Sequence, residues 1–169
     1  NSFEELHTPL RIVAVDLDRG ETVAFGDRTH RSVTISEAVQ ASTALPGLYR
    51  PVHLKGKDYV DGGVTKTAHI NLAIRHGADL IICINPLVPY DSRLPGRNAR
   101  TPRRLAEGGL PAVLAQTLRA IVHSRMEVGM QRYKREFPGA DVVLFEPNKH
   151  DPEMFFTNIF SYSSRQRVC

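Results

Sequence analysis

Residues 57–84 read KDYVDGGVTKTAHINLAIRHGADLIICI, and their pattern indicates the fold class. A predicted strand over Lys57–Val60 runs into Asp61-Gly62-Gly63. A helical pattern then extends from Ala68 to His76, and the glycine that follows favours the left-handed C-cap of a helix. Leu80–Ile84 is short and entirely apolar, which is typical of a strand buried on both faces of a parallel sheet. The stretch therefore predicts a strand–helix–strand unit.

The same alternation continues upstream. Arg11–Val15 and Thr22–Gly26 predict two strands joined by a tight turn, because both are short and rich in β-branched residues. Thr34 and Glu37 have the spacing of a capping box, which predicts the start of a helix that ends before Pro46.

Downstream, apolar residues recur every three or four positions from Leu114 to Phe137 and predict a long helix. Val142–Phe145 predicts another strand and Pro152–Arg167 a final helix. Because strands alternate with helices, we predict the α/β class: a mostly parallel sheet with helices on both faces.

Composition sets limits on the class of protein. The chain has 169 residues, of which 41% are hydrophobic and 24% charged, so it corresponds to one domain or part of one. This composition excludes a wholly disordered, collagen-like or disulfide-stapled chain. The two cysteines form no zinc-binding pattern, and Cys83 is expected to be a buried small hydrophobic residue. No signal peptide is recognisable, and no apolar stretch approaches the roughly 20 residues that cross a bilayer.

Asp61 is the candidate for chemistry, with Gly62 and Gly63 as its support. It follows a predicted strand, and ligands in open α/β sheets bind at the carboxyl ends of strands. The two glycines permit unusual backbone angles and the close approach of a substrate or another backbone. On these three residues alone an ordinary turn is the favoured interpretation, since Asp-Gly is a common turn dipeptide.

The wider sequence resembles the patatin-like phospholipase family. In that family an Ala-Ser-x-Ala-x-Pro turn, an aromatic-x-Pro-Val segment and an Asp-Gly-Gly or Asp-Gly-Ala motif follow in order, as Ala41–Val52 and Tyr59–Gly63 do here. The resemblance covers nearly the whole chain and is strongest from Pro9 to Pro86. Smaller pieces also look like the family: Pro9–Leu17 with Gly20-Glu21, Asn71, Ala73, Gly77–Asp79 and Ser161–Ser163.

The resemblance implies a patatin-like, three-layer fold related to the α/β-hydrolases, and a lipid acyl hydrolase that works with a Ser-Asp dyad. In such an enzyme Asp61 would deprotonate a serine hydroxyl, and the serine would attack the ester carbonyl of a phospholipid or another acyl-ester lipid. No cofactor and no metal are implied.

The sequence departs from the family at the nucleophile. The family carries its serine in Gly-x-Ser-x-Gly and its oxyanion donors in a separate glycine-rich loop, and none of the nine serines here has glycine two positions before it. Ser42 is interpreted as a structural member of its motif. We therefore expect residues 1–169 to be a partial patatin-like domain that lacks an N-terminal segment of the same domain and is inactive alone.

Histidines and carboxylates elsewhere predict no further site. The seven histidines lack ligand spacing, and His69, although near Asp61 in sequence, is expected to belong to a helix as a satisfied surface or core residue. Asp16-x-Asp18-x-Gly20 resembles the start of a calcium loop, but the glycine and glutamate of such a loop are misplaced, so a hairpin turn is predicted.

A basic Pro/Arg-rich loop is predicted at about residues 87–109. Its arginines lie within twelve residues that contain no acid: Arg93, Arg97, Arg100, Arg103 and Arg104. The chain carries a net charge of +4, and outside these twelve residues it has 17 basic and 18 acidic residues. Three interpretations are ranked in order: a solvated loop, contact with anionic phospholipid headgroups, and contact with nucleic acid, for which no motif exists. No nucleic-acid partner is therefore predicted.

Two functional hypotheses follow. The first is the serine-dependent lipid acyl hydrolase, with an acyl pocket drawn from Leu45, Leu48, Tyr49, Met126 and Met130, although methionines at helical spacing are more often core. The second is a non-catalytic patatin-like module that binds lipid or a protein partner. The sequence does not identify a compartment; a cytoplasmic or peripheral membrane location is the expectation.

Overall fold

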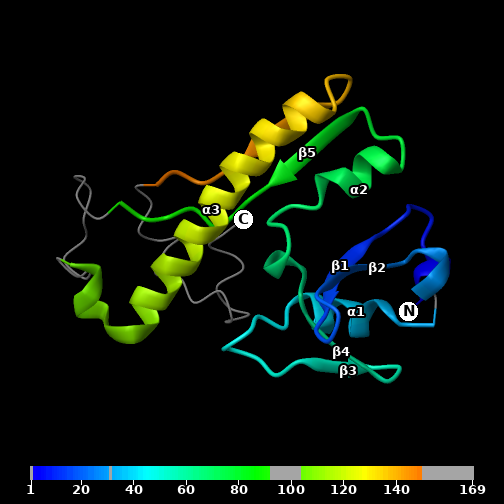
Figure 1. Cartoon of the computed structure of the whole chain (residues 1–169), viewed down its shortest axis with the longest axis horizontal. Helices are drawn as coiled ribbons and strands as arrows, with labels where there is room; N and C mark the ends of the chain where they lie inside the picture. Colours follow the sequence, from blue (N-terminus) through cyan, green and yellow to red (C-terminus); the bar gives the residue numbers. More distant parts are fainter. Residues whose placement is uncertain (1, 31, 92–103, 150–169) are drawn as a thin grey trace. The chain divides into compact units, whose positions relative to one another are not determined.

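The computed structural model describes residues 2–30, 32–91 and 104–149 (Figure 1). These described residues form two compact units, one within residues 1–69 and the other within residues 70–169. In the described part of the chain, no helix is both long enough and apolar enough to cross a membrane.

Within its described residues the first unit contains four strands, one α-helix and three short 3-10 helices. They are η1 (Phe3–Glu5), β1 (Ile12–Asp16), β2 (Glu21–Phe25), η2 (Arg28–His30), α1 (Ile35–Ser42), β3 (Val52–Leu54), β4 (Lys57–Asp61) and η3 (Gly62–Val64). The strands form one sheet in the order β2-β1-β4-β3, and every neighbouring pair is antiparallel.

Tight turns explain the two hairpins of this sheet. Residues 17–20 connect β1 to β2, and Gly20 has the positive φ of 66° that such a turn favours. Lys55 and Gly56 connect β3 to β4 with φ values of 52° and 77°. A two-residue turn with positive φ at both positions matches the twist of paired antiparallel strands.

The core of the first unit lies between the sheet and α1, which packs against β1 and β4. Phe25 is fully buried, and its ring meets that of Tyr59 edge to face at 5.2 Å between centroids. Ala38 and Ala41 are the buried residues of α1, and such small side chains allow a helix to lie close to a sheet. The capping box predicted at Thr34 is confirmed, since its side chain and that of Glu37 each accept from the other's backbone N–H.

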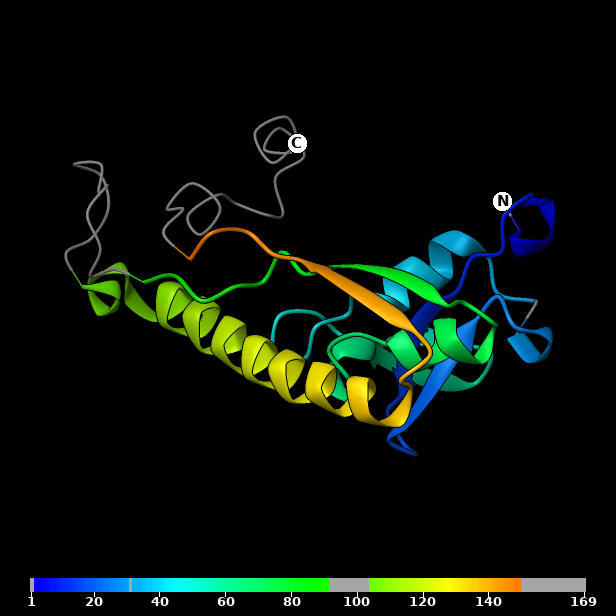
Figure 2. The same ribbon diagram turned by 90° about the horizontal axis from the view of Figure 1, so that it is seen from above.

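The described part of the second unit is an α/β arrangement. Its elements are α2 (Ile70–Arg75), β5 (Leu80–Ile84), η4 (Leu105–Gly108), α3 (Gly109–Glu136) and β6 (Asp141–Phe145). β5 and β6 pair in parallel, from Leu80 with Asp141 to Ile84 with Phe145. Parallel pairing requires a crossover, and the long α3, which lies alongside this pair, provides it (Figures 1 and 2).

Side-chain amides fix the segment that follows β5. The buried Asn85 donates to the carboxylate of Glu146 at 2.8 Å. Gln116 of α3 pairs with the backbone of Tyr90, accepting from its N–H at 3.1 Å and donating to its carbonyl at 2.8 Å. The backbone N–H of Asp91 donates to the carbonyl of Lys149 at 2.9 Å. The chain is thus anchored just before the arginine-rich stretch.

The α/β class is confirmed, but the predominance of parallel pairing is not. Among the described residues, three pairings of neighbouring strands are antiparallel and one is parallel. Two of the antiparallel pairings are the hairpins β1–β2 and β3–β4, whose short turns leave no room for a crossover helix, and the third joins β1 to β4. The helix predicted at Pro152–Arg167 lies outside the described residues.

The prediction that Leu80–Ile84 is buried on both faces is wrong. Leu80, Ile82 and Ile84 of β5 are 60%, 63% and 75% exposed, whereas Ile81 is buried. Cys83, on the same side as Ile81, is half-buried rather than fully buried, and this burial raises the pKa of its thiol.

Candidate active site

Asp61 is held at the end of a paired strand. It is the last residue of β4, lies opposite Ala14 of β1, and donates its backbone N–H to the carbonyl of Ala44 at 3.1 Å. It is also the N-cap of η3, so the strand ends and a tight turn begins at this residue. The backbone of Asp61 is therefore held by its strand and by Ala44, and its side chain is half-buried.

The two oxygens of the Asp61 carboxylate differ in their environment. Oδ1 accepts the backbone N–H of Gly63 at 2.7 Å, within its own turn. Oδ2 accepts no hydrogen bond from the residues that the structure describes. One oxygen therefore fixes the side chain, and the other remains available to accept a proton from a hydroxyl group.

Gly62 and Gly63 are required for two different reasons. A Cβ atom on the buried Gly62 would lie 2.6 Å from the carbonyl oxygen of Val13, which is backbone of β1 and cannot move aside. A Cβ atom on Gly63 would lie 3.0 Å from Oδ1 of Asp61. The first glycine thus allows the turn to pack on the sheet, and the second leaves room for the carboxylate.

The carbonyl oxygen of Gly62 accepts hydrogen bonds from several groups. Four donors lie within 3.5 Å of its oxygen: the N–H of Thr65 at 3.3 Å, the N–H of Lys66 at 3.5 Å, the hydroxyl of Thr65 at 3.3 Å and the Nε2 of His69 at 3.2 Å. The Thr65 hydroxyl also lies 2.9 Å from that of Thr22 on β2. The turn after Asp61 is therefore tied both to its own downstream segment and to the sheet.

His69 does not form a triad with Asp61. The helix predicted from Ala68 begins two residues later, at Ile70, so His69 precedes α2. Its Nε2 donates to the Gly62 carbonyl and not to the carboxylate of Asp61. Burial lowers the pKa of His69, and the bond to Gly62 only partly opposes this effect. The ring is therefore neutral near pH 7 and carries its proton on Nε2. The sequence did not predict this hydrogen bond, because a helical pattern gives no information about contact with a backbone carbonyl seven residues earlier.

Part of the predicted acyl pocket lies near this turn. Leu45 follows Ala44, the partner of the Asp61 N–H, and its carbonyl accepts the N–H groups of Leu48 and Tyr49 at 3.1 and 3.0 Å. Leu48 and Tyr49 are exposed. Ser42 is the last residue of α1.

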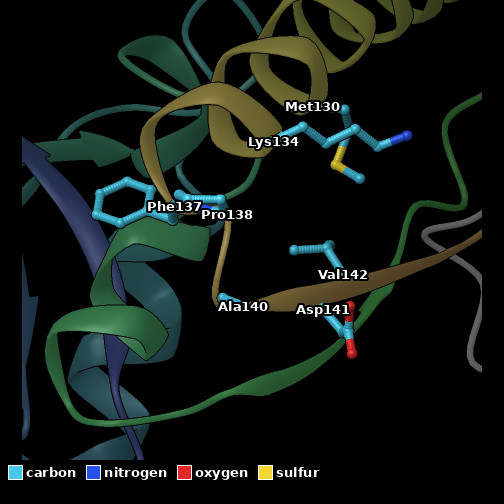
Figure 3. A pocket seen from close by; sticks show the side chains of 7 residues that line it. All are labelled: Met130, Lys134, Phe137, Pro138, Ala140, Asp141 and Val142. Carbon is cyan, nitrogen blue, oxygen red and sulfur yellow. The ribbon is translucent and has the colours of Figure 1, made fainter.

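Met126 and Met130 belong to α3 in the second unit, where Met126 is buried. Met130 lines a cavity of about 210 Å³ between the end of α3 and the start of β6, together with Lys134, Phe137, Pro138, Ala140, Asp141 and Val142 (Figure 3). Among the described residues that line this cavity there is no serine, cysteine or histidine.

The Asp16-x-Asp18-x-Gly20 sequence forms the predicted hairpin turn. Asp16 is buried, and its carboxylate accepts the N–H of Arg19 at 3.3 Å and pairs with the ammonium of Lys57 at 3.3 Å. In the described ranges, no group of three or more histidine, cysteine, aspartate or glutamate side chains is placed to bind a metal ion.

The arginine-rich loop lies mostly outside the described residues, which exclude Arg93, Arg97, Arg100 and Arg103. Arg104 is described, is exposed, and occupies the N-cap position of η4 without a capping hydrogen bond from its side chain. Ser161–Ser163 of the resemblance also lies outside the described residues.

Comparison with known proteins agrees with the sequence resemblance over the part of the chain that holds Asp61. The model of the patatin-like phospholipase family matches residues 1–74. The uncharacterized protein YjjU of Escherichia coli (strain K12) is 32% identical over 75 residues, an alignment that covers 44% of this chain and 21% of YjjU. The chain thus matches about a fifth of the length of this relative.

Proposed function

We propose that this chain, which is patatin-like over residues 1–74, carries the acid of a Ser-Asp dyad in a lipid acyl hydrolase, and that Asp61 is that acid. The observation that supports the assignment most directly is that the two carboxylate oxygens of Asp61 differ in their hydrogen bonding. Oδ1 is bonded within the turn, and Oδ2 is available for the proton of a serine hydroxyl.

In the proposed reaction Asp61 acts as a general base and then as a general acid. Asp61 accepts the hydroxyl proton as the serine oxygen bonds to the acyl carbon, and the proton passes to the alcohol that leaves when the ester C–O bond breaks. Water then attacks the acyl-enzyme, gives its proton to Asp61, and releases the fatty acid as the serine regains its hydrogen. A carboxylate is a weak base for a hydroxyl group. Hydrogen-bond donors must therefore also stabilise the negative charge that develops on the ester oxygen.

This proposal assigns the serine and the oxyanion donors to a segment outside these 169 residues. None of the nine serines lies in Gly-x-Ser-x-Gly, and Ser42 sits at the end of α1, where a small hydroxyl ordinarily bonds to the backbone. The substrate class follows from the family: phospholipids or related acyl esters.

Hydrolysis assays on two proteins test this proposal. The natural protein in full should release fatty acid from phospholipid vesicles and nitrophenol from p-nitrophenyl acyl esters, and a fluorophosphonate should label its serine. The purified 169-residue chain should do neither, because it lacks the nucleophile. Robust turnover by the 169-residue chain would overturn the assignment of the serine. A full protein that binds vesicles without hydrolysing them would support the non-catalytic module instead.

The arginine-rich loop would bring such an enzyme to its substrate. We expect the triple change of Arg100, Arg103 and Arg104 to glutamine to weaken binding to anionic vesicles about a hundredfold at low ionic strength. Each arginine near such a surface contributes about 1 kcal/mol, and about 1.4 kcal/mol corresponds to a tenfold change. Vesicle co-sedimentation across a salt series measures this loss.

A matched triple variant removes the same charge elsewhere, at the exposed residues Arg50, Arg75 and Arg135. It should lose much less affinity, and neutral vesicles should not distinguish the two variants. Equal losses in both triple variants would mean that net charge alone, and not this loop, attracts the membrane.

A further inference from the structure

We propose that His69 is a positioning residue for Asp61, acting through the peptide group that joins Gly62 to Gly63. This inference rests on the proposed function, because it assigns His69 a part in the reaction of Asp61. It assigns the histidine neither proton transfer nor contact with the substrate.

The geometry is a continuous chain of hydrogen bonds. The Nε2 of His69 donates to the carbonyl oxygen of Gly62 at 3.2 Å. That carbonyl belongs to the same planar peptide group as the N–H of Gly63, which donates to Oδ1 of Asp61 at 2.7 Å. His69 therefore binds the carbonyl end of the planar Gly62–Gly63 peptide group, and the N–H end of the same group binds the carboxylate of Asp61.

Two physical effects follow from this chain. A donor on the carbonyl fixes the tilt of the peptide plane, and the tilt decides the direction in which the Gly63 N–H points. Polarisation of the carbonyl also strengthens donation by the N–H at the other end, as in other chains of hydrogen bonds. Both effects hold Oδ1 in place and so direct Oδ2 toward the position of the serine hydroxyl.

The protonation state of His69 suits this role. Burial is the main reason that its pKa is lowered, and the Lys66 charge acts in the same direction, while the Gly62 carbonyl and the Asp61 charge oppose it. The neutral ring places its single proton on Nε2, where the carbonyl requires it. The hydroxyl of Thr65 supports the same carbonyl and is itself in contact with Thr22.

The test compares three substitutions of His69 in the full natural protein. His69→Gln places an amide N–H near the position of Nε2 and should retain most of kcat. His69→Leu fills the space without a donor, and His69→Asn is too short to reach the carbonyl. We expect each of these two to lower kcat about tenfold with KM little changed, because the substrate site is untouched.

The amide proton of Gly63 gives a readout that does not depend on turnover. Its NMR signal should lie downfield, because it donates to a carboxylate, and should shift upfield in His69→Leu and His69→Asn but not in His69→Gln. A histidine needed only for packing would be replaced well by leucine and poorly by glutamine, which is the opposite order. The exposed His53 is the control, and His53→Leu should change neither signal nor rate.

Asp61→Asn in the same assay separates the two proposals. If Asp61→Asn retains turnover, the proposed function fails whatever His69 does. If Asp61→Asn abolishes turnover while His69→Leu or His69→Asn leaves both kcat and the Gly63 signal unchanged, only the role of His69 is overturned. Should His69→Leu fail to fold, the polar His69→Asn decides the outcome.

Discussion

Asp61→Asn is expected to reduce kcat for acyl ester hydrolysis by about a thousandfold or more in the full natural protein while leaving the fold intact. The amide oxygen can still accept the Gly63 N–H, as Oδ1 of Asp61 does at 2.7 Å, so the turn should survive. The amide nitrogen replaces Oδ2 and cannot accept the proton of a serine hydroxyl. Initial rates with a p-nitrophenyl ester measure the loss, and circular dichroism checks the fold.

Asp58→Asn is the matched control for this variant. Asp58 lies on the same strand, its side chain is 45% exposed, and it pairs with His53 at 2.8 Å. The same chemical change at this position should leave kcat within about twofold, since exposed pairs contribute little. Retained turnover in Asp61→Asn, or an equal loss in Asp58→Asn, would remove Asp61 from the mechanism.

Gly62→Ala is expected to have the largest effect on stability. The new Cβ would lie 2.6 Å from the carbonyl oxygen of Val13 and 3.2 Å from its Cγ1, so either β1 or the turn must shift. Overpacking of this kind costs about 1–3 kcal/mol, and a backbone partner places the cost at the upper end of that range. Urea denaturation followed by circular dichroism measures the change in the free energy of unfolding.

Gly63→Ala tests whether the two glycines have different roles. Its Cβ would meet only the side-chain oxygen Oδ1 of Asp61 at 3.0 Å, and that side chain can rotate. We expect stability to change by less than about 1 kcal/mol and kcat to fall, because the carboxylate loses its orientation. If Gly62→Ala were as stable as the parent protein, the close packing of this turn on β1 would be contradicted.

Local signals in the sequence predicted local structure well. The capping box of Thr34 and Glu37 and the β1–β2 hairpin depend on residues within a few positions of one another, so spacing and turn chemistry suffice. The position of Asp61 at the end of a strand could be predicted for the same reason.

Non-local pairing was harder to predict. An apolar run indicates a strand but not its partner, and β4 pairs with β1, which lies much earlier in the chain, in the antiparallel direction. Predicting a mostly parallel sheet assumed that neighbouring strands are linked through helices, whereas Lys55 and Gly56 form a hairpin turn. The role of His69 depends on how η3 folds back, which no periodic pattern encodes.

The apolar face of the β5–β6 pair affects how the protein behaves at high concentration. In the parallel register Ile82 lies beside Val143 and Ile84 beside Phe145, and all four side chains are exposed. Exposed apolar faces of this kind favour self-association, so we expect the isolated chain to aggregate as its concentration rises. A lysine at Ile82 would place a charge at the centre of that face, far in sequence from Asp61, and is the natural solubilising change for biophysical work.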